Sequence, residues 1–203
     1  MRNRTTHQSG NAILEFAMVA PLFIVMLFGV FTTGMSISKS QQVASLAREA
    51  GGMFLRSVDF SVPGNQAMLI RQAGSLGMTA DGGNGVILLS ALKRVGDRDC
   101  LAAGVEPRNC PNLGLLVVVK RQVVGNRGLY QSTFGAPEIV EADGTVLAAQ
   151  YLSDPACQAP KFGTVISLAD GETAYLAEAF FRTPQLDIPG YKRDSTIYQR
   201  AIF

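Results

Sequence analysis

The N-terminal part of the chain is dominated by one long apolar run. It extends from about Ala12 to Met35, and between Asn11 and Ser38 the only ionisable side chain is Glu15. A membrane-spanning helix needs about 20 consecutive apolar residues, so the run is long enough to cross a bilayer. The pattern therefore predicts a transmembrane helix with one carboxylate near its N-terminal edge.

The apolar run continues into an amphipathic pattern. Apolar residues recur at spacings of three and four, which is typical of one face of a helix, at Val43, Leu46, Ala47, Ala50 and Phe54. No proline occurs between Pro21 and Pro63. We therefore expect one helix over about residues 11–56, transmembrane over 11–36 and extramembrane over 37–56.

From residue 57 to residue 203 the pattern indicates a separate domain with a short helix and several strands. A helical window begins at Pro63, and the turn "DGGNG" follows at 81–85. Two runs bounded by glycine, "GVILLSALKRV" at 85–95 and "GLLVVVKRQVV" at 114–124, are rich in β-branched and aliphatic residues and predict strands. The second run is apolar on both faces, so we expect it to be a central strand covered on one side by the long helix.

The remaining strands are expected around two Asp-Gly pairs and at the C-terminus. The pairs at 143–144 and 170–171 stand between strand-like arms over 139–147 and 165–182, which predicts two hairpins. The final segment "TIYQRAIF", at 196–203, predicts a last strand. The expected fold class is α+β, with the outer half of a long N-terminal helix packed on a mainly antiparallel sheet.

Composition narrows the possible functions. The 203 residues are 47% hydrophobic and 17% charged, which suits one anchor and one domain, and a net charge of +2 is too small to indicate a nucleic-acid partner. His7 is the only histidine and precedes the apolar run, so the later part lacks Ser-His-Asp, Cys-His and histidine-bearing zinc sites. We expect no catalytic residue, metal or cofactor. If the domain were an enzyme, Glu178 would be the best partly buried acid, although a hydrogen-bonded strand residue is the simpler interpretation.

The three cysteines all follow the apolar run. Cys100 and Cys110 flank a loop between two predicted strands, and Pro107 and Pro111 stiffen it. Outside the cytoplasm such thiols oxidise, so we expect a Cys100–Cys110 disulfide, with Cys110–Cys157 as the alternative. No Cys-x-x-Cys occurs, so a redox-active motif is not supported.

Charge around the apolar run indicates its direction. Arg2 and Arg4 precede it, and Lys39 is the first cation after it, a bias that favours a cytoplasmic N-terminus and an external C-terminal domain. A cleaved signal peptide is an alternative, but the run is long for one and lacks a clear Ala-x-Ala site. An ordinary signal anchor would account for the apolar run and its flanking charges, but not for the segment "SGNAILEF" (residues 9–16) at the start of the run.

That edge forms a recognisable motif. Gly10 is followed by four residues, then Glu15 and Phe16, then the apolar helix, and a polar, basic leader occupies 1–10. This arrangement resembles the processing site of type IV prepilins. With Pro21 five residues after Phe16, it more specifically resembles the TadE/TadF-type pseudopilins of the Tad (Flp-type, type IVb) pilus. The segments "YLAEAFFR" at 175–182 and "IYQRAIF" at 197–203 resemble the last strands of such proteins.

The resemblance implies a pilin-like fold and a structural role without enzymatic activity. A large outer domain, and Phe16 where major pilins usually carry Tyr, favour a minor pseudopilin, with a TadG-like relative as an alternative. The implied location is the bacterial inner membrane, crossed once, with a cytoplasmic N-terminus and a periplasmic domain. The implied partners are other pilins through the N-terminal helix, a prepilin peptidase and the pilus assembly platform. A signal-anchored periplasmic binding module or enzyme unrelated to pili is the alternative function.

The resemblance also gives the carboxylate a role. Cleavage between Gly10 and Asn11 would create an α-amine, which is largely cationic at neutral pH. Glu15 would then pair with the amine of its own chain, four residues away, or with that of a neighbouring subunit during assembly. The alternative is that Glu15 extends from the helix edge into the lipid headgroups.

Overall fold

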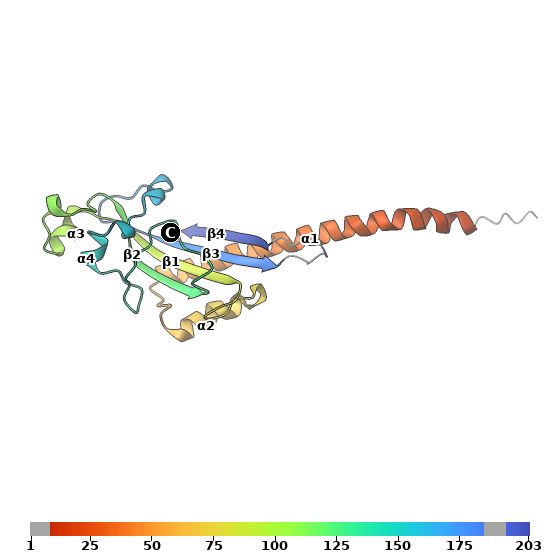
Figure 1. The fold of residues 1–203 in the computed structure, drawn as a ribbon, viewed down its shortest axis with the longest axis horizontal. Helices are drawn as coiled ribbons and strands as arrows, with labels where there is room; N and C mark the ends of the chain where they lie inside the picture. The colour runs from red at the N-terminus through yellow and green to blue at the C-terminus, as the bar shows by residue number, and fades with distance from the viewer. Residues whose placement is uncertain (1–8, 185–193) are drawn as a thin grey trace, which may run out of the picture. The chain divides into compact units, whose positions relative to one another are not determined.

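The computed structural model describes residues 9–184 and 194–203. The chain divides into two compact units, of which the first ends at Ser40 and the second is Gln41–Phe203. We call the second unit the sheet domain. The elements in chain order (Figure 1) are α1 (Ser9–Leu55), α2 (Pro63–Gln72), β1 (Gly85–Arg94), α3 (Asp97–Ala102), β2 (Leu116–Gly125), α4 (Ala148–Tyr151), β3 (Thr173–Pro184) and β4 (Asp194–Ile202).

Helix α1 matches the long helix predicted over 11–56. It passes through Pro21 without ending, since a proline removes only one backbone hydrogen bond. The helix ends in a Schellman motif: the amide of Ser57 donates to the carbonyl of Phe54 (2.9 Å), and that of Val58 donates to Met53 (3.1 Å). Ser57 has a φ of 64°, a left-handed conformation in which glycine is favoured.

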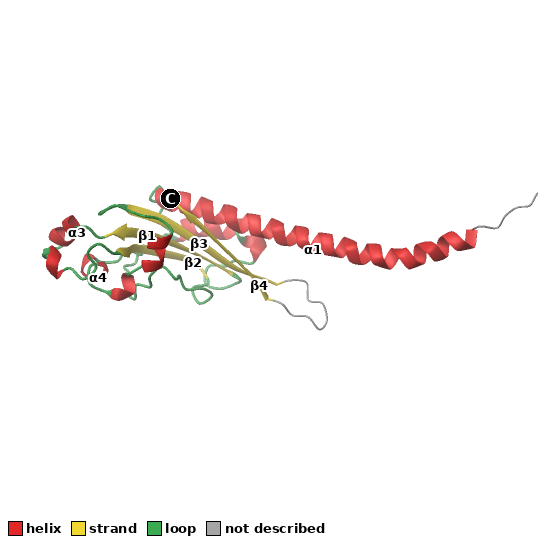
Figure 2. Ribbon diagram, turned by 90° about the horizontal axis from the view of Figure 1, so that it is seen from above, coloured by secondary structure: helices red, strands yellow, loops and turns green. Residues whose placement is uncertain are grey.

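The sheet has four strands in the order β2-β1-β3-β4, and every neighbouring pair is antiparallel. The C-terminal part of α1, from Gln41 onwards, runs alongside the strands in both views (Figures 1 and 2). It packs there with the predicted face inwards, because Val43, Leu46, Ala47, Ala50 and Phe54 are buried in one cluster with residues of β1 and β3 such as Ile87, Leu89, Ala177 and Phe181. The expected α+β fold, with the outer half of the helix on an antiparallel sheet, is confirmed.

The segments that join the strands cover the remaining apolar surface of the sheet. The connection between β2 and β3 contributes Phe134, Ala159 and Phe162 to a second cluster. These side chains pack against Leu92 of β1, Val118 of β2 and Leu176 of β3. A third cluster gathers all three cysteines with Val95, Val117, Val146 and Leu152. The sheet is therefore covered on both faces, which explains why β1 and β2 read as nearly continuous apolar runs.

The predicted central position of the 114–124 strand is wrong. β2 lies at one edge of the sheet, and the two central strands are β1 and β3. Its outer side meets the chain at two isolated bridges, Val117 with Gln158 and Lys120 with Thr145. Apolar residues on both faces indicated burial on both faces, and a strand that the chain's own loops cover satisfies that pattern as well as a central strand does.

The two predicted hairpins are also wrong, although both Asp-Gly turns exist. At the first turn, Thr145 donates to Asp143 from its backbone amide (2.9 Å) and its hydroxyl (2.7 Å), and no strand flanks the turn on either side. At the second turn only the downstream arm is a strand. β3 already has β1 and β4 as neighbours, so the upstream arm at 165–169 has no edge on which to pair.

Candidate functional sites

The N-terminal motif lies within α1. Gly10, Asn11, Glu15 and Phe16 are all helical, while residues 1–8 of the predicted leader lie outside the described residues. Side chains are described from Ile13 onwards, and Glu15 and Phe16 are exposed, Phe16 by 73%. The arrangement places the carboxylate and the aromatic ring together at the start of the helix.

The helix surface after the motif is exposed and apolar. Most large side chains between residues 13 and 37 are more than half exposed, including those of Leu22, Phe23, Phe28 and Val30. Within the described residues, α1 is the one helix long and apolar enough to cross a membrane. An exposed apolar surface of this extent is unfavourable in water, so this part of α1 requires lipid or another protein around it.

Glu178 is the most unusual polar residue of the sheet domain. It is fully buried on β3, and its Oε1 accepts hydrogen bonds from the hydroxyls of Tyr130 (3.0 Å) and Tyr198 (2.7 Å). Its Oε2 is buried and has no hydrogen-bond partner among the described residues. Burial and the nearby carboxylate raise the pKa of both tyrosines, so the two hydroxyls stay protonated as donors.

A half-buried cation, Arg121, accompanies this carboxylate. Arg121 of β2 donates from Nε to Ser90 Oγ (3.0 Å) and from its terminal nitrogens to the carbonyls of Gly135 (2.6 Å) and Phe134 (2.8 Å). Burial lowers the pKa of Arg121, and the charge of Glu178 opposes that shift. Glu178 is thus a hydrogen-bonded strand residue, and its own side chain is fully buried.

The sequence did not indicate Arg121, Tyr130 or Tyr198 as members of this cluster. Arg121 stands in the Lys-Arg pair at 120–121, and such isolated pairs are typical of strand ends and solvated faces. Tyr130 comes from an irregular segment, and the positions of Tyr130 and Tyr198 in the sequence have no regular spacing that relates them to Glu178. The one signal in the sequence was the position of Glu178 between Ala177 and Ala179 in an apolar segment.

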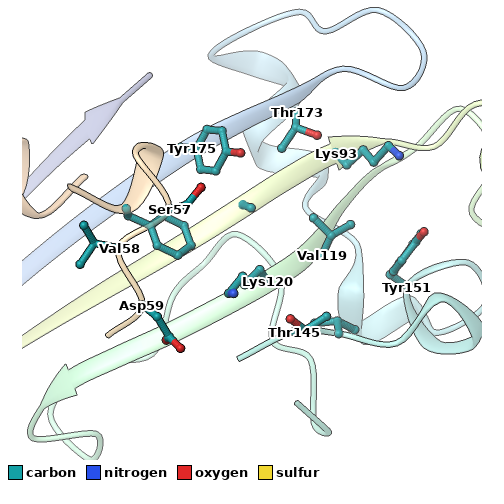
Figure 3. A pocket seen from close by; sticks show the side chains of 13 residues that line it. Ser57, Val58, Asp59, Lys93, Val119, Lys120, Thr145, Tyr151, Thr173 and Tyr175 are labelled. Carbon is teal, nitrogen blue, oxygen red and sulfur yellow. The ribbon is translucent and has the colours of Figure 1, made fainter. Parts of the chain in front are cut away.

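A groove of about 440 Å³ opens beyond the C-terminal end of α1 (Figure 3). Its lining combines hydroxyl groups and charged side chains with apolar surface, and the polar members include Ser57, Asp59, Lys93, Lys120, Thr145, Tyr151, Thr173 and Tyr175. Both lysines are already paired, Lys93 with Asp99 and Lys120 with Asp143 (3.2 Å).

The aspartates around the groove are held ionised by local hydrogen bonds. Donation from the hydroxyl and amide of Thr145 lowers the pKa of Asp143 to about 2, and donation from Ser61 lowers the pKa of Asp59. No cluster of three or more His, Cys, Asp or Glu that could hold a metal occurs among the described residues. The groove therefore presents paired charges and hydroxyl groups beside its apolar lining.

The cysteines are divided between a bridge and a free thiol. Cys100 and Cys110 form a disulfide in the structure, with Cα atoms 6.2 Å apart. Cys157 is free and buried, and burial raises the pKa of its thiol to about 11. The bridge closes the connection between β1 and β2, which contains α3.

Comparison with known proteins bears on the N-terminal motif. The fold and the exposed helix define an α+β protein whose N-terminal helix is suited to a membrane. Residues 10–51 match the family model described as "TadE-like protein". The matched segment begins at Gly10 and covers the exposed apolar part of α1 and most of its buried face. The match confirms the resemblance drawn from the sequence and supports a TadE-like component of a Tad pilus.

No curated protein and no solved structure matches the chain.

Proposed function

We propose that the chain is a minor pseudopilin, a membrane-anchored structural component that assembles into or primes a Tad (Flp-type) pilus. One observation carries the proposal: the TadE-like match covers Gly10, Glu15 and Phe16 together with the exposed apolar surface of α1. This role requires the chain to associate with other molecules, and the exposed helix offers apolar contact area to lipid or to other helices.

The proposed location is the bacterial inner membrane, with the N-terminus in the cytoplasm and the sheet domain in the periplasm. The charge bias of Arg2 and Arg4 over Lys39 supports this direction. The Cys100–Cys110 bridge supports it as well, because disulfides persist mainly in oxidising compartments. The proposed partners are a prepilin peptidase, the pilus assembly platform and other pilins.

The proposed processing step is hydrolysis of the peptide bond between Gly10 and Asn11. Gly10 has no Cβ, so a peptidase can approach its backbone closely. Glu15, four residues after the new amine on the same helix, then offers it a carboxylate. In the low dielectric of a bilayer or helix bundle, such a pair contributes far more than it would on a water-exposed surface.

The proposal is tested by removing the gene and complementing with two forms of the chain. One is the full chain, and the other has residues 11–38 replaced by an apolar helix of the same length from an unrelated single-span protein. We expect the full chain to restore pili and the replaced form to reach the membrane without restoring them. Normal piliation without the gene would contradict the proposed function, and piliation by the replaced form would contradict assembly through α1.

A further inference from the structure

The two edges of the sheet differ in how they are covered. At the β2 edge the chain itself supplies partners: the amide of Val146 donates to the carbonyl of Val119 (2.9 Å), and that of Ala159 donates to Leu116 (2.8 Å). The amide of Arg121 donates to the carbonyl of Gly144 (2.7 Å). This edge has no room for another strand.

The β4 edge is bare among the described residues. The amide and carbonyl of Phe203 both bond to Tyr175, and the register between β3 and β4 runs without a shift from Leu176–Ile202 to Pro184–Asp194. Hydrogen-bonded and non-bonded pairs alternate in an antiparallel ladder, so every second residue of β4 directs its backbone groups away from β3. From residue 195 to residue 202 these are Thr196, Tyr198, Arg200 and Ile202, and none of them has a backbone partner on that side among the described residues.

β4 lacks several of the features that protect natural edge strands against pairing. Natural edge strands are usually short, or carry a proline, a lysine or a bulge. β4 has nine residues and contains none of these. Its one cation is Arg200, an exposed residue whose guanidinium lies 5.8 Å from the ring centre of Phe134 and forms no ion pair among the described residues.

We propose that the β4 edge is a docking site for an extended segment of a different pilus subunit, which adds a fifth strand and places a carboxylate beside Arg200. Main-chain hydrogen bonds give such strand addition its affinity, and side chains on alternate positions give it specificity. The identity of the partner rests on the proposed function, whereas the bare edge is a property of the sheet itself.

Symmetry and anchoring exclude a second copy of this chain as the occupant. The C-terminal part of α1, residues 41–55, runs alongside the strands (Figures 1 and 2). Antiparallel pairing of two β4 strands about a two-fold axis would therefore make the two copies of this segment antiparallel, so that the ends that continue towards the anchor face opposite directions, and one membrane cannot receive both. Parallel pairing about a two-fold axis would set identical backbone groups at the same height, so that amides face amides. The occupant is therefore a chemically different strand.

Photocrosslinking in piliated cells tests the proposal with the full chain. A photoreactive amino acid replaces Arg200 in one strain and, as a matched control, the exposed Arg71 of α2 in another. The probes are the major pilin and the other pseudopilins of the same pilus, each carrying an epitope tag. We expect an adduct with one tagged subunit from position 200, at a yield about tenfold above that from position 71, since the partner strand lies within side-chain reach across the ladder.

Two variants test the chemistry of the edge through pilus number. Thr196→Pro removes an outward amide, a change that edge strands tolerate, and Arg200→Glu reverses the charge, with Arg71→Glu as its control. We expect Arg200→Glu and Thr196→Pro each to lower pilus number by about tenfold, because like charges and a missing donor oppose docking, while Arg71→Glu leaves it unchanged. Equal crosslinking from positions 200 and 71 in piliated cells, or an adduct only with a second copy of this chain, would overturn the inference. Both results would leave the proposed function standing, because they concern the partner at the sheet edge and not the requirement for the gene or the processing of the chain.

Discussion

Gly51 of α1 and Phe203, the last residue of the chain, are in direct contact. A Cβ atom on Gly51 would lie 2.4 Å from Cε2 of the Phe203 ring and 3.0 Å from the Cβ of Ala177. The backbone of Phe203 is fixed by two hydrogen bonds to Tyr175 (2.9 and 3.0 Å). The helix and the C-terminal end of the sheet therefore meet at a position where only glycine fits without a shift.

This contact predicts opposite effects for two adjacent glycines. Gly51→Ala must displace the Phe203 ring, and we expect it to destabilise the sheet domain by about 1 kcal/mol, the lower end of the overpacking range. Gly52→Ala has no atom within 4 Å of the new Cβ, so we expect it to stabilise the helix by about 0.5–1 kcal/mol. Thermal unfolding of the full chain in detergent measures both.

A double substitution identifies the cause. In the Phe203→Ala background the penalty of Gly51→Ala should shrink by at least about 0.5 kcal/mol, since contacting residues are not additive. Equal penalties in both backgrounds would show that the ring of Phe203 is not what excludes a side chain at position 51.

The end of α1 gives a second prediction. Ser57 adopts a left-handed conformation, with a φ of 64°, which costs a residue other than glycine about 1 kcal/mol. We therefore expect Ser57→Gly to raise the free energy of unfolding by up to that amount. Ser45→Gly, at an exposed position inside the same helix, should lower it by about 0.5 kcal/mol. If both variants were destabilised equally, the Schellman geometry at Ser57 would be contradicted.

The cysteines give a third prediction, which concerns covalent structure. Closing a loop of ten residues should stabilise the domain by about 2–3 kcal/mol in the chain-entropy model, so Cys100→Ser should lower the denaturant midpoint by a corresponding amount. The pKa of about 11 at Cys157 means that its thiol stays protonated at neutral pH and should react with iodoacetamide only after unfolding. Peptide mapping without reductant checks the pairing, and recovery of Cys110 linked to Cys157 would show that the bridge is elsewhere.

The helices and strands in which apolar residues recur at regular spacing were predictable from the sequence. The face at Val43, Leu46 and Ala50 lies at helical spacing, and these residues are buried as expected. β1 and β2 were expected at 85–95 and 114–124 and lie at 85–94 and 116–125. The local pattern was sufficient for these elements, because the spacing of their apolar residues determines which face of the helix or strand is buried.

Strand order and the buried polar cluster were not predictable in the same way. Both depend on which segments meet in three dimensions. The upstream arm at 165–169 has strand-like residues, yet β1 and β4 occupy both sides of β3. Arg121 and Tyr130 join Glu178 from different segments, and no spacing along the chain relates one to the other.

The carboxylate at the start of α1 gives a fourth prediction. Glu15→Gln keeps the shape of the side chain and removes the charge, so membrane insertion should be unharmed. If Glu15 pairs with the processed amine of a neighbour, that amine loses its partner, and stranding one member of a buried pair costs about 3–5 kcal/mol. We therefore expect normal amounts of processed protein but little crosslinking to other pilins. Normal crosslinking at normal abundance would show that Glu15 has no role in assembly.

The central claim, that this chain is a pseudopilin processed after Gly10, is tested most directly by the intact mass of the membrane-bound protein in cells with and without the prepilin peptidase. With the peptidase, we expect a mature chain that begins at Asn11 and lacks residues 1–10. Without the peptidase, the mass should be higher by that of the ten-residue leader, and a Gly10→Val variant should keep the leader in either strain, because a side chain at the cut hinders close approach to the backbone. An identical mass in both strains would contradict the account.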